Sequence, residues 1–421
     1  MKFYKENEFK ETQIGRIPKD WKVVKLEDSE VSYLIKSGST PSRNRVDYWN
    51  GTIPFVTIGD MTKTIKYLYD TESKITEFAL KNSNTFLVAK DSILLSMYGT
   101  IGKIVINKIA TAISQNIAGI IPNRENVYVE FLHYALMHFS FQFKSAKIIT
   151  LKHLDIQMVK NTKIPLPPLN EQRAIAEILS TVDEAIQKID EMIAKTERLK
   201  KGLMQELLTK GIGHKEFKDT EIGRIPKDWE VVKIGDIAQT SSGGTPNRAK
   251  KEYYNGNIPW VKSSELKDNI IYDTEEKITE EGLQNSSAKI FPKGTLLVAM
   301  YGATVGKTGI LGIDAATNQA ICAILPNKTF DPNFLKNYII FRRDRLISIS
   351  SGGAQPNISQ EIIRAFKIPL PPLQEQQRIA EILFTIDKKL EIERDEKAKL
   401  ERIKQGLMNL LLTGKIRIKV S

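Results

Sequence analysis

The sequence contains one stretch that resembles a nucleotide-binding loop. Gly302–Thr308 is one residue shorter than the phosphate loop G-x-x-x-x-G-K-[ST], in which a glycine-rich backbone and a lysine bind phosphate and the final hydroxyl binds magnesium. A related stretch ends in Gly102-Lys103-Ile104 and lacks that hydroxyl. We therefore predict a turn between strands at both places. Such a turn could be purely structural, or its backbone amides and lysine could bind a nucleic-acid phosphate.

The motifs of other enzyme chemistries are missing. The histidines, at positions 133, 138, 153 and 214, show no H-x-x-x-H or H-E-x-x-H spacing, and the single Cys322 cannot form an internal disulfide or a cysteine zinc site. A methyltransferase acting on DNA bases would show Asn or Asp before Pro-Pro and an aromatic residue, whereas both Pro-Pro pairs here follow a leucine, Leu166 or Leu370. We expect no catalytic residue and no metal site in this chain.

Side chains that pair with base edges are the chemistry that this sequence does offer. Arg and Lys bind guanine, and Asn and Gln bind adenine, through paired hydrogen bonds. We predict base contacts from residues of these types in expected loops, namely Arg43, Arg45, Gln115, Asn116, Arg248, Lys250, Lys251, Asn318, Gln319, Gln355 and Asn357. We expect phosphate contacts instead from Thr40, Lys103, Thr245 and Lys307. For each of these residues the alternative is an ordinary solvated loop side chain.

The charge balance favours a polyanionic partner. Of 421 residues, 62 are Lys or Arg and 50 are Asp or Glu, which gives a net charge of +12. A lysine-rich proteome would give the same excess, so charge alone does not decide the partner. Hydrophobic residues make up 41%, no apolar run is long enough to span a membrane, and the first residues lack the apolar run of a secretory signal. We expect a soluble, cytoplasmic protein without membrane contact.

The chain contains the same segments twice, in the same order. Residues 9–21 and 217–229 are identical at 11 of 13 positions, and residues 164–183 and 368–387 at 15 of 20. A period of about 200 residues is far longer than the roughly 20–50 residues of solenoid or propeller units, so a whole domain is duplicated. Between these markers the copies share short segments and differ elsewhere. We infer a constant frame around contents that perform two versions of one task.

Each copy begins with a globular head. The heads show features of an α+β domain with a twisted sheet. These are short apolar runs at residues 92–98 and 295–301, Asn-Gly turn signals at 50–51 and 255–256, and helical stretches at 129–143 and 332–347.

A long helix is predicted after each head. Each begins after a Pro-Pro pair, with Asn170 as the expected N-cap of the first, and has about 39 residues, or about 58 Å at about 1.5 Å per residue. Apolar residues in steps of three and four predict a helix–helix seam of Leu179, Val182, Ile186, Ile189, Ile193, Leu383, Ile386 and Leu390. Glu393 and Lys397 fall where the second seam should continue. The alternative is two separate amphipathic helices, each covering its own head.

The order of head, helix, head and helix suggests a geometry. If the helices pair antiparallel, a pseudo-two-fold axis relates the two copies, and duplex DNA has two-fold axes of its own. Each head would then meet its own short DNA sequence, and the helices would set the distance between the two sequences.

Several segments recur in both copies in a characteristic order. These are the IGxIPxxW opening, the SGxTP, IPxV and YGx(x)xGK segments, and the PLPPLxEQxxIAxIL entry to each helix. Through them the chain resembles the specificity (S) subunit of type I restriction–modification enzymes over essentially its whole length. The resemblance implies an α+β fold in which two target-recognition domains with twisted sheets are separated by two long helices in an antiparallel coiled coil. The expected boundaries are 1–168, 169–210, 211–372, 373–414 and a tail at 415–421.

The resemblance also implies a division of labour. Each domain would read one half of a bipartite site in double-stranded DNA, while two modification (methyltransferase) subunits dock on the helices. Those subunits would carry S-adenosylmethionine, and restriction subunits would carry ATP and Mg for translocation and cleavage, so this chain would hold no cofactor and catalyse nothing. The alternatives are a fused fragment of a DNA methyltransferase or nucleotide-dependent enzyme, and a scaffold without DNA contact.

Overall fold

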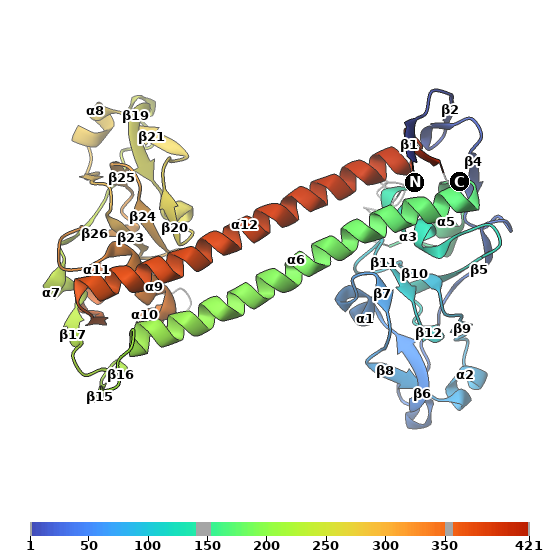
Figure 1. The fold of residues 1–421 in the computed structure, drawn as a ribbon, viewed down its shortest axis with the longest axis horizontal. Helices are drawn as coiled ribbons and strands as arrows, with labels where there is room; N and C mark the ends of the chain where they lie inside the picture. The colour runs from blue at the N-terminus through green and yellow to red at the C-terminus, as the bar shows by residue number, and fades with distance from the viewer. Residues whose placement is uncertain (1, 140–152, 350–356, 420–421) are drawn as a thin grey trace. The chain divides into compact units, whose positions relative to one another are not determined.

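The computed structural model describes residues 2–139, 153–349 and 357–419 and divides the chain into two compact units. Unit 1 comprises Met1–Asp190 and Glu396–Ser421, and unit 2 comprises Glu191–Asp395. Each unit contains one head. There are two long helices, α6 (Leu169–Lys210) and α12 (Leu373–Leu411), and each of them has one part in unit 1 and the other part in unit 2 (Figure 1).

Head 1 is built on two mixed sheets. The five-stranded sheet has the order β5 (Ser32–Ser37), β13 (Ile117–Pro122), β10 (Ser92–Ser96), β11 (Ile104–Asn107) and β7 (Tyr67–Leu68). The four-stranded sheet has the order β8 (Ser73–Ile75), β6 (Trp49–Val56), β12 (Thr111–Ile113) and β9 (Leu87–Val88). Short helices complete the head: η1 (Val46–Tyr48), α1 (Ile58–Lys63), α2 (Glu77–Asn82), α3 (Val129–His138) and α5 (Ile156–Lys160).

Head 2 repeats both sheets strand for strand. Its five-stranded sheet has the order β18 (Thr240–Ser242), β26 (Ile321–Ile324), β23 (Leu296–Ala299), β24 (Thr308–Leu311) and β20 (Asn269–Ile271). Its four-stranded sheet has the order β21 (Glu276–Ile278), β19 (Tyr254–Val261), β25 (Ala315–Thr317) and β22 (Ile290–Phe291). The helices are α7 (Ile234–Ile237), η3 (Lys251–Tyr253), η4 (Ser263–Glu265), α8 (Glu280–Gln284), α9 (Pro332–Phe341), α10 (Arg343–Ser348) and α11 (Gln360–Ala365).

Paired short strands lie beside each head. They are β1 (Lys2–Lys5) with β28 (Ile416–Lys419), β2 (Phe9–Thr12) with β3 (Gly15–Pro18), β4 (Lys22–Lys25) with β14 (Lys163–Leu166), β15 (Phe217–Thr220) with β16 (Gly223–Pro226), and β17 (Glu230–Lys233) with β27 (Lys367–Leu370). The first part of the IGxIPxxW opening therefore forms the second strand of a hairpin, and the first two residues of the PLPPL segment end a strand before the chain enters the helix.

The two Asn-Gly pairs do not form turns between strands, and this prediction is wrong. Asn50 has a φ of 60° and lies within β6, where the pairing with β8 shifts register between Trp49 and Ile53. Asn255 has a φ of 61° at the same place in β19. Asn tolerates the left-handed conformation, so the pair makes an irregularity within one strand instead of a hairpin.

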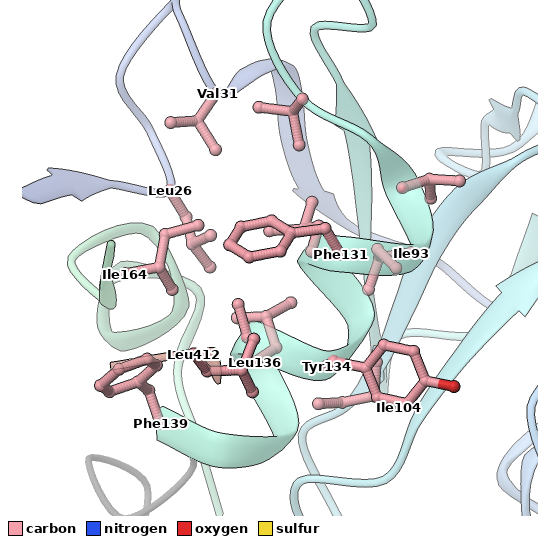
Figure 2. Packing of buried hydrophobic residues seen from close by; sticks show 14 of the residues in the cluster. Leu26, Val31, Ile93, Ile104, Phe131, Tyr134, Leu136, Phe139, Ile164 and Leu412 are labelled. Carbon is pink, nitrogen blue, oxygen red and sulfur yellow. The ribbon is translucent and has the colours of Figure 1, made fainter. Parts of the chain in front are cut away.

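Helices lie at both stretches of the heads where they were predicted. The first, at 129–143, is α3, which ends at His138, and residues 140–152 lie outside the described part of the chain. The second, at 332–347, is two helices, α9 and α10, which meet at Arg342. In head 1, α3 packs on β10 and β11, and its Phe131, Tyr134 and Leu136 fill the core together with Ile93 and Ile104 (Figure 2).

Both units show the long helices packed antiparallel. In unit 1, Asp183 of α6 pairs with Lys404 of α12 at 2.5 Å, and further along α6 Asp190 pairs with Lys397 at 2.6 Å. In unit 2, Glu197 pairs with Arg394 at 2.7 Å and Lys200 with Asp387 at 2.5 Å. Partner numbers fall along α12 as they rise along α6, which defines an antiparallel coiled coil.

The predicted seam residues are all buried or half-buried, and Leu179 and Leu383 belong to the hydrophobic clusters that the helices share with head 1 and head 2. Four of them are buried and the others are half-buried, the buried ones being Leu179, Ile189, Leu383 and Leu390. Where the second seam lacks apolar residues, polar pairs take their place: Thr196 Oγ1 donates to the buried carboxylate of Glu393 at 3.1 Å, and Lys397 pairs with Asp190. Asn170 is not an N-cap, because α6 already begins at Leu169. The amides of the first turn bind the carbonyl of Pro168 instead.

Candidate nucleic-acid interface

Three segments of head 1 that carry predicted DNA contacts meet at one edge of its five-stranded sheet. Residues 38–40 follow β5, residues 97–103 join β10 to β11, and residues 114–116 join β12 to β13. The Gly38 amide donates to the Ile117 carbonyl at 3.0 Å, and the Met97 amide donates to the Asn116 carbonyl at 2.8 Å. We term these three segments the loop cluster of head 1. It brings together Thr40, Lys103, Gln115 and Asn116.

Head 2 has an equivalent loop cluster, made of residues 243–245, 300–307 and 318–320. The Gly244 amide donates to the Thr317 carbonyl at 2.9 Å, and the Met300 amide donates to the Ala320 carbonyl at 2.8 Å. A Cβ atom on Gly243 would lie 2.0 Å from the Thr317 carbonyl oxygen, so only glycine permits this close approach. The glycine of the SGxTP segment thus has a structural cause.

The amide side chains of the two clusters differ in availability. Gln115 and Gln319 are exposed at equivalent positions, and the Thr245 hydroxyl donates to the Gln319 side-chain carbonyl. Asn318 is half-buried and its Oδ1 accepts from the Ala320 amide at 3.2 Å, so this side chain stabilises the turn. Asn116 is half-buried as well. The two glutamines are therefore the amides best placed to meet a base.

The loops that resemble a phosphate loop are hairpin turns. Residues 300–307 join β23 to the antiparallel β24, so no helix N-terminus follows them as a nucleotide-binding loop requires. Lys307 pairs with Asp268 at 3.1 Å, whereas Lys103 donates to the Ile65 carbonyl at 3.4 Å and has Ile65 at the position equivalent to Asp268. Burial lowers the pKa of Lys103. Among the described residues, Lys103 is thus the lysine of the two that has no carboxylate beside it.

The predicted arginines and lysines after the SGxTP segments lie outside the loop clusters. Arg43 is exposed, and Arg45 donates to both carboxylate oxygens of Asp47 at 2.8 and 2.6 Å with its guanidinium 4.7 Å from the Tyr48 ring centre. Hydrogen bonding by Arg45 lowers the pKa of Asp47. These contacts hold Arg45 in one orientation.

In head 2 the equivalent residues are also engaged. Arg248 pairs with Glu276 at 2.5 Å and lies 4.6 Å from the Tyr254 ring centre, while Lys250 donates to the Tyr253 hydroxyl at 2.8 Å. Lys251 is exposed at the start of η3. Arg248 was expected to be available for a base, but a base would have to compete with the Glu276 carboxylate.

Sequence reasoning missed an aromatic pair at the loop cluster of head 1. His153 stacks on Tyr98, with ring centres 5.1 Å apart and planes inclined by 3°. The next amide in the chain, that of Leu154, donates to the Met97 carbonyl at 2.9 Å. In head 2 the Ile358 amide donates to the Met300 carbonyl at 2.7 Å, which places exposed Asn357 at the same edge. Gln355 lies outside the described residues. The Tyr-Gly dipeptide, which occurs in both copies as Tyr98-Gly99 and Tyr301-Gly302, was the sequence signal that could have indicated an aromatic side chain here.

Among the described residues, no group of three or more His, Cys, Asp or Glu side chains could hold a metal ion. Burial raises the pKa of the Cys322 thiol to about 12, so this group is not a reactive thiolate. No helix within the described ranges is long and apolar enough to cross a bilayer.

Solved structures share this fold over nearly the whole chain. A chain from a structural study of complex assembly and conformational transition of a type I restriction–modification system matches with a TM-score of 0.59 and 20% identity, covering 95% of this chain and 99% of that one. The S subunit of a type I system from M. genitalium matches with a TM-score of 0.56 and 16% identity, covering 96% and 97%. At such identities these matches establish the fold alone.

The family follows from the sequence comparisons. The model of the type I restriction modification DNA specificity domain matches twice, at residues 18–198 and 226–402. The MjaVIII and MjaIX specificity subunits of type I restriction enzymes from Methanocaldococcus jannaschii are 33% and 28% identical, over 100% and 99% of this chain and 98% of each relative. The chain therefore belongs to the type I restriction–modification DNA specificity family, with one specificity domain in each match. The resemblance seen in the sequence is confirmed.

Proposed function

We propose that the two heads read the two halves of a bipartite DNA site on behalf of a type I restriction–modification complex. The observation that carries this proposal is the repeated frame with diverged loops: the sheets recur strand for strand, whereas the loop clusters present different side chains. Gln115 and Gln319 are equivalent and exposed, but Lys103 lacks the carboxylate that Lys307 has in Asp268. One scaffold with two sets of loops suits two different short sequences.

The helices α6 and α12 would set the gap between the half-sites and dock two modification subunits. Each helix is unbroken, with 42 and 39 residues, and their contacts fix the register in each unit. A rigid element of this kind keeps its length, so it can select one spacing of the DNA target.

The chain itself would catalyse nothing. The segment that resembles a phosphate loop, Gly302–Thr308, lies in a hairpin turn, and the described His, Cys, Asp and Glu side chains form no group that could bind a metal ion. S-adenosylmethionine would bind the modification subunits, and ATP and Mg would bind the restriction subunits. A fused methyltransferase fragment or a nucleotide-dependent enzyme would instead require a cofactor loop in this chain.

A matched deletion tests the spacing role. Residues 187–193 of α6 and residues 394–400 of α12 would be removed together, at the level of the Asp190–Lys397 pair. Seven residues shorten a helix by about 10 Å, which is about three base pairs of duplex. Mapping of methylated positions by the reconstituted complex should show the same two half-sites with a gap about three base pairs shorter. A change in the bases recognised in either half-site, with the distance between the half-sites unchanged, would refute the proposal.

A further inference from the structure

Both heads contain the same exposed turn between their two sheets. The turn reads Tyr69-Asp70-Thr71-Glu72 in head 1 and Tyr272-Asp273-Thr274-Glu275 in head 2. It follows β7 and precedes β8 in head 1, and it follows β20 and precedes β21 in head 2. We term it the YDTE turn. It lies outside the loop clusters, so base reading does not account for it.

The threonine and the acids of the YDTE turn have internal structural roles. Thr71 Oγ1 accepts from the Phe55 amide at 3.2 Å, and Thr274 Oγ1 accepts from the Trp260 amide at the same distance. Asp70 pairs with Lys74 at 3.5 Å, as Asp273 pairs with Lys277 at 3.3 Å. These contacts hold the turn in the same conformation in both heads.

The second acid is paired in both heads as well, but by lysines from different positions. Glu72 pairs with Lys63 of α1, and Glu275 pairs with Lys262 at 2.9 Å. The ion pair is therefore restored although its lysine has moved in the sequence. A partner that meets the same charge pattern in both heads would explain why the pattern is kept.

Among the described residues, the tyrosine forms no hydrogen bond or ion pair of this kind, and Tyr69 contacts only the edge of its own head through the Tyr67 ring, 6.4 Å away between ring centres. Tyr69 is 67% exposed and Tyr272 is 68% exposed, although a tyrosine in a diverged surface could readily have been replaced by a polar residue. Tyrosine is among the residues that contribute most to protein–protein binding, because its ring buries a large area and its hydroxyl forms a hydrogen bond. Two equally exposed tyrosines on equivalent turns indicate two equivalent contacts.

The tyrosines lie beside the long helices of their own units. Tyr69 lines a groove together with Asp183 and Glu184 of α6 and Lys404 of α12. In unit 2, the pKa of Lys388 of α12 is raised chiefly by its hydrogen bond with Glu391, and Tyr272 contributes a smaller part of this shift. Lys388 occupies the position equivalent to Glu184, since the segments that enter the two helices, 164–183 and 368–387, align without a gap. The surface around each tyrosine is thus continuous with the flank of a long helix.

We propose that Tyr69 and Tyr272 are equivalent anchor points for one protein partner that binds the chain twice, once on each unit. This inference rests on the proposed function, in which that partner is the modification subunit. The local charge favours protein over DNA: each YDTE turn carries two carboxylates, each already matched by a lysine, and so offers phosphates no net positive charge. A protein pocket that takes an aromatic ring and meets paired charges fits this surface.

Reconstitution with the modification subunit tests the proposal. Tyr69→Ala and Tyr272→Ala should each raise the Kd of one of two bound copies at least tenfold, and the double variant should weaken both. Native mass spectrometry and sedimentation velocity, at concentrations near the wild-type Kd, count the bound copies. Tyr69→Phe and Tyr272→Phe should keep most of the binding, because the ring remains.

Tyr33→Ala is the matched control. Tyr33 is 62% exposed but occurs in head 1 alone, where its hydroxyl donates to Asn123 Oδ1 at 2.9 Å, and its loss should leave the number of bound copies unchanged. If the double alanine variant binds two copies with wild-type Kd, the proposal is refuted. It is refuted equally if both copies stay bound and DNA affinity falls instead, which would assign the turns to DNA. The proposed function fails separately, if the wild-type complex methylates no two-part site.

Discussion

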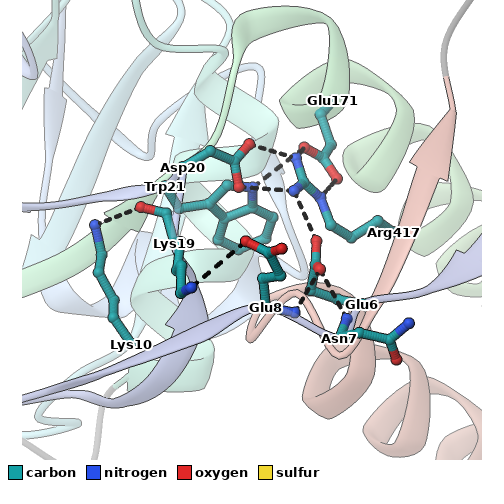
Figure 3. Close-up of polar contacts among 9 residues, drawn as sticks. All are labelled: Glu6, Asn7, Glu8, Lys10, Lys19, Asp20, Trp21, Glu171 and Arg417. Carbon is teal, nitrogen blue, oxygen red and sulfur yellow. Dashed lines mark hydrogen bonds and ion pairs between the residues drawn. The ribbon is translucent and has the colours of Figure 1, made fainter.

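Arg417, from the last described strand of the chain, donates to both carboxylate oxygens of Glu171 in the first turn of α6, at 2.9 and 2.8 Å (Figure 3). The same guanidinium binds Asp20 and Glu6, and the Trp21 indole donates to Glu171 at 3.2 Å. The side chains involved come from the β1–β28 pair, the IGxIPxxW opening and the helix entry. These contacts join the beginning of unit 1 to its end.

Unit 2 has a different side chain at the equivalent carboxylate. His214 contacts Glu375 at 2.8 Å, and the Trp229 indole donates to the same carboxylate at 3.0 Å. The tryptophan and the glutamate of the two repeated motifs therefore form the same contact twice. Histidine can replace arginine here because Glu375 also accepts from the Ile212 amide at 2.9 Å.

Replacing Arg417 should destabilise unit 1 strongly. Arg417→Met leaves the buried carboxylate of Glu171 without its cation, and breaking a buried pair in this way costs about 3–5 kcal/mol. Urea unfolding of unit 1 followed by Trp21 fluorescence measures this change. Arg16→Ala serves as the control, since Arg16 pairs with Glu11 on the surface and should contribute less than about 1 kcal/mol. Equal effects of the two substitutions would contradict the role assigned to Arg417.

His133 should make the stability of unit 1 sensitive to acid. Burial, with Lys66 and Lys404 nearby, lowers the pKa of His133 to about 3 in the folded chain, whereas an unfolded histidine titrates near about 6.5. Between these values the unfolded state binds a proton that the folded state does not, so stability falls by about 1.4 kcal/mol per pH unit as the pH drops.

His133→Asn is the matched substitution, because asparagine is a polar side chain of similar size that does not titrate. Unfolding of both proteins would be measured at several pH values from about 6.5 to about 5. The variant should lose stability less steeply than the wild type, and identical slopes would show that His133 is protonated without cost.

Glu393 should weaken the helix pair of unit 2. It is 4% exposed, and its Oε2 has no hydrogen-bond partner among the described residues although Oε1 accepts from Thr196. Glu393→Leu should raise the free energy of unfolding of unit 2 by about 1–2 kcal/mol, since an apolar side chain suits this position better. Glu391→Leu, at an exposed position, is the control and should change little. A destabilised Glu393→Leu variant would indicate that the carboxylate fixes the register of the helices.

Gln115 and Gln319 should each govern one half-site. Gln319→Ala should relax one base position in one half-site by about 1–3 kcal/mol of discrimination and leave the other half-site and the gap unchanged. Gln115→Ala should do the same in the other half, so each variant is the control for the other. Methylation mapping with the reconstituted complex gives the result. Loss of specificity in both halves from one substitution would show that the glutamines act on assembly instead.

Much of the architecture could be predicted because it is written in local pattern. The two helices could be predicted because each is a proline-free run with apolar residues in steps of three and four. Their pairing could be predicted because those apolar residues lie on one side of each helix. The errors are instructive. Asn50-Gly51 was expected to form a turn, but Trp49 and Ile53 on either side of it both pair with Ile75 of β8, and only that pairing makes the site an irregularity within β6. Likewise, Asn170 resembles a cap by residue type, yet the carbonyl of Pro168 already satisfies the first amides.

The candidate site was less predictable because side-chain partners lie far apart in sequence. Arg248 is the type of residue that reads guanine, but nothing near it in sequence indicates that Glu276, 28 residues away, pairs with it. Lys103 and Lys307 stand at the same position of the YGx(x)xGK segment. They differ in their partners, the Ile65 carbonyl and the Asp268 carboxylate, which lie in a different part of each head's sequence. The stacking of His153 on Tyr98 is equally invisible in either segment alone.

The sequence by itself determined that this protein has two related heads and two long helices, since repetition and periodicity are properties of the order of residues. Tertiary structure alone decided which polar side chains remain available and which are held by a partner. It also placed Arg417 on Glu171, 246 residues apart. Hydrogen bonds and ion pairs depend on distances of a few ångströms, and no local pattern specifies which distant segments approach so closely.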